Sequence, residues 1–193
     1  MKRICVFCAS SDGGSPIYRA TAQAVGSLLA EQGIELIYGG AKVGLMGAVA
    51  DAVLAAGGRV TGVIPEALVL KEVAHASLTE LRIVHSMHER KALMASLSDG
   101  FIAMPGGFGT FEEFCEVLTW GQLGLHDKPC GLLNTAGYYD HMLQMFDHAV
   151  DEQLLKPENR AMVLASSDAR ALLQIMRDYR APVCEKWITP RET

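Results

Sequence analysis

The sequence from residue 101 to residue 113 reads Phe101-Ile102-Ala103-Met104-Pro105-Gly106-Gly107-Phe108-Gly109-Thr110-Phe111-Glu112-Glu113. Its first four residues are an apolar run typical of a buried parallel strand, and the residues that follow, 114–118, have the pattern of a helix. The glycines therefore lie at the carboxyl end of a strand, where open α/β sheets bind their ligands. Such a turn lets the backbone and the first N–H groups of a helix approach an anion, here beside two carboxylates.

Strand and helix patterns alternate along the whole chain. The alternation predicts an α/β fold with a Rossmann-like, doubly wound parallel sheet in a single domain, covered by helices on both faces. We expect this domain to span residues 1–181 and residues 182–193 to form a C-terminal tail. Strands are expected at 3–9, 34–38, 59–64, 81–84, 100–104, 129–133 and 161–165, and helices at 16–32, 44–56, 87–98, 109–123, 138–153 and 167–179.

The composition narrows the classes of function. Among 193 residues, 17 are basic and 22 acidic, so the net charge of −5 gives no reason to expect binding to nucleic acid or to an anionic membrane. The first apolar run ends near residue 9, too short for a signal peptide, and no run reaches the roughly 20 residues of a membrane span. The cysteines are odd in number and scattered, so we expect reduced thiols in a cytoplasmic protein. Cys5 and Cys8 should lie on opposite faces of the first strand.

A second glycine cluster, residues 39–47, follows the apolar run Leu36-Ile37-Tyr38 and opens the helix expected at 44–56. Neither cluster is a G-x-G-x-x-G or a Walker A loop, which argues against dinucleotide hydride transfer and against P-loop phosphoryl transfer. Glycines also make tight turns that bind nothing. Two clusters at strand ends favour a nucleotide-sized site over that alternative.

Arg90 stands on an apolar stripe at helical spacing in residues 87–97. A guanidinium on a core-facing stripe needs a partner, which is either Glu112 or Glu113, or the phosphate of a ligand. The alternative is that Arg90 snorkels at the edge of the helix and that Lys91 is solvated.

Two roles remain open for Glu113 from the residues alone. Thr110 and Glu113 have the spacing of a capping box, in which each side chain caps a backbone N–H group of the other. The same carboxylate, beside a ligand-binding turn, is also a candidate for catalysis. The histidines have no metal-ligand spacing and no G-x-S-x-G is present, so we expect neither a metal nor serine-hydrolase chemistry.

Taken together, these motifs resemble those of the LONELY GUY (LOG) family of cytokinin riboside 5′-monophosphate phosphoribohydrolases. The motifs are Pro105-Gly106-Gly107-x-Gly109-Thr110-x-x-Glu113, Met87-x-x-Arg90-Lys91 and Gly39-Gly40-x-x-x-Gly44-Leu45-Met46-Gly47, and the resemblance extends from Phe7 to Tyr139. It implies hydrolysis of the N-glycosidic bond of AMP or N6-isopentenyl-AMP to the free base and ribose 5-phosphate. It also implies that no cofactor is used, and that the protein is a homodimer with sites near the subunit interface.

The resemblance makes Arg90 and Glu113 the catalytic pair. Cleavage of a ribosyl bond builds positive charge on the sugar, which a carboxylate such as Glu113 stabilises while it orients or deprotonates the attacking water. The residues implied to bind the substrate are Glu72, Lys91, Gly106, Gly107, Phe108, Gly109, Thr110, Phe111, Glu112, Thr119, Gly40, Met46, Ser10 and Ser11.

The sequence departs from the family pattern at two positions. Ala9 stands where members often have glycine, and Glu89, which we expect to face solvent, stands where glutamine is common. Members are often labelled lysine decarboxylases, but no lysine here has the context of a pyridoxal Schiff base. The alternative from another class is a nucleotide or molybdenum-cofactor carrier that binds without hydrolysis. Arg90 and Glu113 favour the enzyme, because a carrier does not require both.

Overall fold

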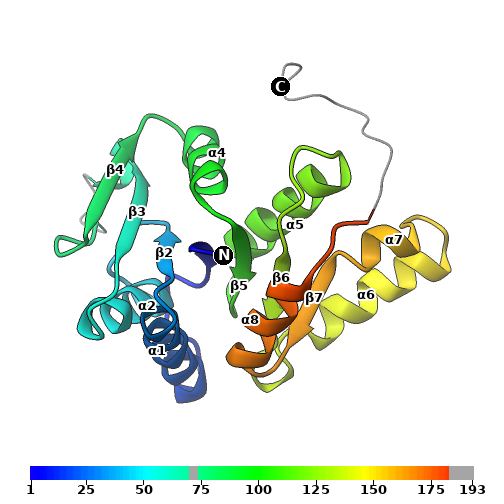
Figure 1. The fold of residues 1–193 in the computed structure, drawn as a ribbon, viewed down its shortest axis with the longest axis horizontal. Coiled ribbons are helices and arrows are strands. Elements are labelled where there is room, and N and C mark those ends of the chain that lie inside the picture. Colours follow the sequence, from blue (N-terminus) through cyan, green and yellow to red (C-terminus); the bar gives the residue numbers. More distant parts are fainter. Residues whose placement is uncertain (70–73, 183–193) are drawn as a thin grey trace.

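Seven parallel strands form one sheet in the computed structural model, which describes residues 1–69 and 74–182 (Figure 1). The strands are β1 (Arg3–Phe7), β2 (Glu35–Tyr38), β3 (Val60–Pro65), β4 (Glu80–Val84), β5 (Gly100–Ala103), β6 (Cys130–Leu133) and β7 (Val163–Ser166). The helices are α1 (Pro16–Glu31), α2 (Gly44–Ala55), α3 (Glu66–Val69), α4 (Met87–Leu97), α5 (Phe108–Gln122), α6 (Asp140–Asp151), α7 (Pro157–Arg160) and α8 (Ala169–Asp178), with a 3-10 turn η1 (Thr135–Gly137). The predicted α/β class is confirmed.

The strand order within the described residues is β4-β3-β2-β1-β5-β6-β7. The chain first moves outward from β1 to β4, and α4 then returns it to β5, which pairs with β1 from Ile4 opposite Gly100 to Phe7 opposite Ala103. The direction of winding therefore reverses between β1 and β5. In open parallel sheets this reversal separates the two connecting loops and leaves a crevice at their carboxyl ends.

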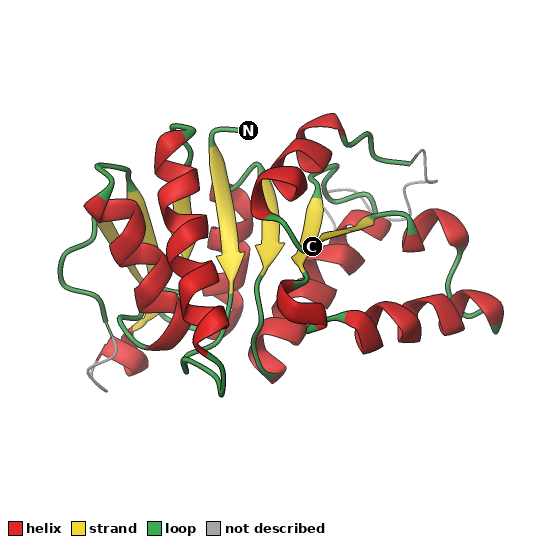
Figure 2. Ribbon diagram, turned by 90° about the horizontal axis from the view of Figure 1, so that it is seen from below, coloured by secondary structure: helices red, strands yellow, loops and turns green. Residues whose placement is uncertain are grey.

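Helices cover both faces of the sheet, as Figure 2 shows. On one face α1, α2 and α8 bury a core that includes Cys8, and on the other face α4 and α5 bury a core that includes Cys5. The expected placement of these two thiols on opposite faces is confirmed. The strand residues are almost wholly apolar and buried because both faces of a parallel sheet must be covered.

The predicted elements differ from the structure mainly where elements are short. Helices α3 and α7 have four residues each, too few to produce a helical period in the sequence. The last strand begins at Val163, because Ala161 still donates its N–H group to Pro157 at the end of α7 (2.9 Å). Helix α6 begins at Asp140, two residues later than expected, since the preceding residues form a turn of their own.

No helix in the described part of the chain is long and apolar enough to cross a membrane. Cys5, Cys8, Cys115 and Cys130 are free thiols. Cys184 and nearly all of the expected tail, 183–193, lie outside the described residues.

The contact between α1 and α2 depends on the absence of a side chain at Gly26. A Cβ atom built there would lie 2.4 Å from the carbonyl oxygen of Val49 and 2.7 Å from the Cβ of Ala52. Alanine would favour an isolated helix by roughly 1 kcal/mol, but overpacking of a close contact costs about 1–3 kcal/mol.

We therefore expect Gly26→Ala to lower the free energy of unfolding by about 1–2 kcal/mol, because overpacking outweighs helix propensity. Urea unfolding measures the change. The control is Ser27→Ala, one position along on the exposed side of α1, which should unfold at the same urea concentration as the unchanged protein or slightly higher. A stabilised Gly26→Ala would show that α1 and α2 can separate freely.

Candidate active site

Three loops meet at the carboxyl edge of the sheet, at the reversal between β1 and β5. The loop after β1 lies between the two glycine clusters: the N–H of Ala9 donates to the carbonyl of Pro105 (3.2 Å), and the N–H of Met46 donates to the carbonyl of Ala9 (3.3 Å). The exposed Ser10 and Ser11 follow directly. The fold thus brings together the predicted site residues of these three loops.

The glycine loop before α5 presents a row of backbone N–H groups without partners. The first backbone hydrogen bond of the helix runs from the N–H of Phe111 to the carbonyl of Gly107 (3.1 Å). The N–H groups of residues 106–110 have no acceptor in the described part of the chain. The Thr110 side chain packs against Gly106, and its hydroxyl makes no hydrogen bond to a described residue. Such a run of amides at a helix N-terminus is suited to a phosphate.

Helix α5 has no side-chain cap, unlike three other long helices. It begins after Gly107, so Thr110 lies inside the first turn and does not occupy the N-cap position. The capping-box interpretation of Thr110 and Glu113 is therefore wrong, because it places the start of the helix too late. The side chains that cap α1, α4 and α8 are Ser15, Ser86 and Asp168, in that order. The α5 terminus thus remains open to a ligand.

The second glycine cluster uses its helix N-terminus differently. At the start of α2 the N–H groups of Leu45 and Met46 donate to the carbonyls of Ser11 and Ala9, both at 3.3 Å. These amides are therefore engaged by the protein itself. The loop of residues 39–47 therefore shapes the site and holds the loop after β1, whereas the α5 loop leaves five consecutive N–H groups, those of residues 106–110, without an acceptor among the described residues.

Arg90 is buried, with 8% of its surface exposed, so the snorkelling alternative is wrong. Its Nε donates to the carbonyl of Val63 (3.1 Å) and its Nη2 to the carbonyl of Gly39 (3.2 Å), and it forms no ion pair with Glu112 or Glu113. A Cβ atom at position 39 would lie 1.8 Å from Nη2. The second glycine cluster, residues 39–47, therefore leaves room for the guanidinium and binds it through the carbonyl of Gly39.

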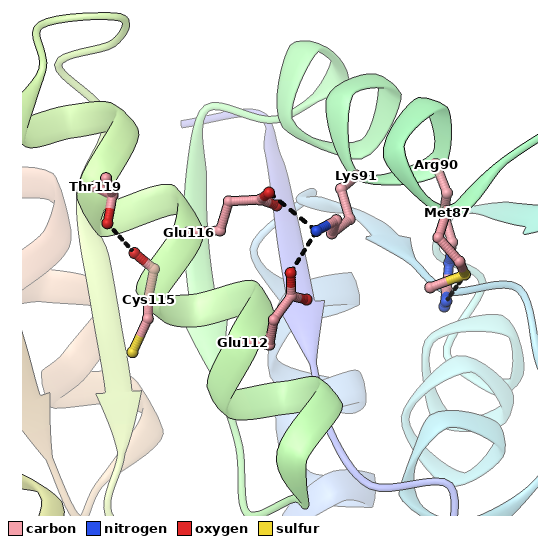
Figure 3. A network of polar contacts seen from close by, with 7 residues as sticks. All are labelled: Met87, Arg90, Lys91, Glu112, Cys115, Glu116 and Thr119. Carbon is pink, nitrogen blue, oxygen red and sulfur yellow. Dashed lines mark hydrogen bonds and ion pairs between the residues drawn. The ribbon is translucent and has the colours of Figure 1, made fainter.

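Lys91 lies between α4 and α5 and is equally buried, so the expectation of a solvated lysine is also wrong. Its ammonium group donates to Glu112 and to Glu116, the second at 2.9 Å (Figure 3). These two carboxylates raise the pKa of Lys91 despite its burial. Lys91 is thus held protonated, and it fixes α4 against the beginning of α5.

Glu113 has a carboxylate without a hydrogen-bond partner in the described part of the chain. Burial raises its pKa to about 7, and the neighbouring charge of Arg90 opposes the rise without a direct contact. Glu112, one residue earlier, is mostly exposed and is paired with Lys91. The two glutamates therefore face different surroundings, and Glu113, with its raised pKa, is placed to exchange a proton near neutral pH.

The remaining predicted residues lie in different places. Gly40 is buried beside Ala41, which forms a backbone bridge with Ala74. Phe108 is 91% exposed at the tip of the α5 loop. Thr119 lies about 16 Å from Phe108 along the axis of α5. Its hydroxyl donates to the carbonyl of Cys115, away from Arg90 (Figure 3). Glu72 lies outside the described residues.

Two residues of this site were missed by the sequence analysis. Glu116 stands one helical turn after Glu112, and this spacing is a signal for a shared lysine partner. Tyr138, which donates its hydroxyl proton to the carbonyl of Gly106, comes from beyond β6 and has no local signal. Glu89 is exposed as expected, and its carboxylate accepts the N–H of His85 (2.8 Å) at the start of α4.

Because the pKa of Glu113 is raised from 4.5 to about 7, the folded state resists ionisation of this group. The resulting penalty is absent below pH 4.5 and complete above pH 7, so Glu113→Gln should increase the free energy of unfolding at pH 8 by about 1–3 kcal/mol. Urea unfolding at pH 5 and pH 8 measures this, and the gain should shrink at pH 5. Glu112→Gln, which removes a partner of Lys91, should instead destabilise the protein at pH 8. If both variants changed the free energy of unfolding at pH 8 in the same direction, this difference between Glu113 and Glu112 would be contradicted.

A family model described as "Possible lysine decarboxylase" matches residues 46–176. The chain is 50% identical over 177 residues to a probable cytokinin riboside 5′-monophosphate phosphoribohydrolase of Oryza sativa subsp. japonica, covering 92% of this chain and 79% of that protein. It is 49% identical over 177 residues to a cytokinin riboside 5′-monophosphate phosphoribohydrolase of Rhodococcoides fascians, with coverage of 91% and 89%. Its fold is similar to that of the molybdenum cofactor binding protein of Rippkaea orientalis, with a TM-score of 0.68, 20% identity, and coverage of 91% and 94%. The chain therefore belongs to the LOG family of cytokinin riboside 5′-monophosphate phosphoribohydrolases.

Proposed function

We propose that this protein hydrolyses the N-glycosidic bond of AMP or of N6-prenylated AMP, giving the free base and ribose 5-phosphate. The observation that carries the proposal is the state of Glu113. It is a carboxylate with a pKa of about 7, close to Arg90 but not paired with it, on the first turns of a helix whose free amides suit a phosphate. The names of the relatives, at about half identity over most of the chain, support the same reaction.

The substrate's 5′-phosphate would bind to the N–H groups of residues 106–110 and to the hydroxyl of Thr110. Two of the three donors of the Lys91 ammonium are taken by glutamates, which leaves one for the substrate. Ser10, Gly40 and Met46 line the neighbouring edge, where we place the ribose and the base. Binding of the phosphate at a fixed point orients the sugar towards Glu113.

In the reaction the bond between the base nitrogen and C1′ of the ribose breaks, and the electron pair leaves with the base. The ionised Glu113 stabilises the positive charge that develops on the ribose and accepts a proton from the attacking water. The water oxygen forms the new bond to C1′, and the proton passes to the departing base. Arg90, which is fixed by two backbone carbonyls, favours the ionised state of Glu113.

The decarboxylase label of the family model has no counterpart in this site. A lysine that forms a Schiff base must be able to lose its proton. Lys91 is held by two carboxylates that raise its pKa, which favours the charged ammonium. Lys91 is therefore an ion-pair partner in this proposal and does not act as a nucleophile.

The test is incubation of the purified protein with AMP and with N6-isopentenyl-AMP, followed by chromatography of the products. We expect free base from the unchanged protein, and about a hundredfold less from Glu113→Gln, because the general base is removed. Glu89→Gln, an exposed neighbour of Arg90 outside the site, is the control and should retain turnover. Full activity in Glu113→Gln would contradict the assigned role. Tight nucleotide binding without any base released would favour the carrier alternative.

We further propose a homodimer. Thr119 is the predicted substrate residue that the fold keeps away from its own glycine loop, and it lies exposed on α5, so a second copy could receive it. Sedimentation equilibrium should give twice the mass of one chain. A single-chain mass at micromolar concentration would contradict the dimer and leave Thr119 without a role.

We also propose a cytoplasmic location, which the four free thiols support, since reducing compartments keep cysteines unpaired. Residues 1–181 are proposed as the nucleotide-binding domain and 182–193 as a tail. A net charge of −5 disfavours nucleic acid and anionic membranes as partners, so we propose that the anionic nucleotide is bound by the local amides of the α5 loop.

A further inference from the structure

All three carbonyl groups that lead into the α5 loop are engaged by the protein. Tyr139 donates its hydroxyl proton to the carbonyl of Met104 (2.7 Å), Ala9 donates its N–H to Pro105 (3.2 Å), and Tyr138 donates its hydroxyl proton to Gly106. A trans peptide is planar, so the N–H of the next residue points away from each carbonyl. The hydroxyl of Tyr138 therefore sets the direction of the N–H of Gly107, one of the free amides.

The two tyrosines come from a backbone turn that is itself unfavourable. Ala136 has φ of 52° and Gly137 has φ of 73°, and a left-handed conformation costs a residue with a Cβ roughly 1–2 kcal/mol. Asn134 holds the turn closed, because its amide donates to Asp140 (2.7 Å) and its oxygen accepts the N–H of Tyr139 (2.7 Å). Strain of this kind persists where the surroundings enforce it, and it gathers at functional sites.

The ring of Tyr138 is packed independently of its hydroxyl. It meets the ring of Tyr18 edge-on at 5.8 Å between centroids and lies 6.5 Å from the ring of Phe111. Removal of the hydroxyl alone should therefore leave the ring in place and release only the carbonyl of Gly106.

We propose that Tyr138 is a positioning residue for the phosphate-binding loop: its hydroxyl holds the Gly106–Gly107 peptide so that the N–H of Gly107 faces the substrate's phosphate. This rests on the proposed function, because it deepens the assignment of the phosphate to that loop. Tyr138 acts through the peptide and leaves the chemistry at Glu113 untouched.

Tyr139 provides a matched control for this role. Its hydroxyl makes the same kind of bond to the same loop, but the carbonyl of Met104 is joined to Pro105, which has no N–H group. Loss of the Tyr139 hydroxyl therefore releases no phosphate donor. It is also the more buried of the two side chains, so its loss should act mainly on stability.

The experiment compares Tyr138→Phe with Tyr139→Phe. KM and kcat are measured with AMP, the dissociation constant of ribose 5-phosphate by calorimetry, and stability by urea unfolding. We expect Tyr138→Phe to raise KM and the dissociation constant about five- to tenfold, the effect of one hydrogen bond, with kcat within about twofold. Tyr139→Phe should keep both constants within about twofold and unfold at lower urea.

An unchanged KM and dissociation constant in Tyr138→Phe, or equal rises in the two variants, would overturn the inference. If the unchanged protein binds ribose 5-phosphate but releases no base, the proposed reaction fails, and the two dissociation constants still decide the role of Tyr138. If the unchanged protein binds no ribose 5-phosphate at all, both the phosphate site and the role of Tyr138 are wrong.

Discussion

Within the described part of the chain, Arg90 is held by two backbone carbonyls and forms no ion pair with a carboxylate, and the chemistry of the site depends on this. A buried guanidinium usually takes an acidic partner, which lowers the pKa of that acid. Here Nε and Nη2 of Arg90 donate to the carbonyls of Val63 and Gly39. Glu113 has no hydrogen bond to a described residue, and burial raises its pKa. The position of the cation still favours the ionised carboxylate. Glu113 can therefore change its charge near neutral pH.

The adjacent lysine, Lys91, pairs with the carboxylates that Arg90 does not contact. Lys91 takes Glu112 and Glu116 as partners and removes them from competition for Arg90. Two neighbouring cations on α4 thus have opposite kinds of partner, backbone for one and carboxylates for the other. Because the Lys91 pairs also fix α4 on α5, the same contacts set the relative positions of Arg90 and Glu113.

The sequence predicted the fold well because the signals for a parallel sheet are local. Buried strands appear as short apolar runs, and glycines mark where each run ends. The hydrogen-bond partners in the site are harder to predict from the sequence, because they are far apart in the chain. Arg90 bonds to Gly39, 51 residues away, and Tyr138 bonds to Gly106, 32 residues away. The capping-box interpretation failed for a related reason. The spacing of Thr110 and Glu113 fits the motif, but the helix begins at Phe108, so Thr110 is already inside its first turn.

The two glycine clusters look alike in sequence, and the hydrogen bonds of their backbone N–H groups and carbonyls distinguish them. At α2 the N–H groups of Leu45 and Met46 bond to carbonyls of the loop after β1, so these two donors are already engaged by the protein. At α5 the carbonyls are bound and the amides are free, the reverse arrangement. The first N–H groups of any helix lack intrahelical acceptors, and residues 107–109 are exposed, so free amides alone do not require a ligand. What distinguishes this loop is that the bound carbonyls of Pro105 and Gly106 fix the direction of the amides that follow them, beside a strained turn. The hydrogen bonds to the carbonyls of the α5 loop therefore favour it as the binding loop, a distinction that the glycines alone do not make.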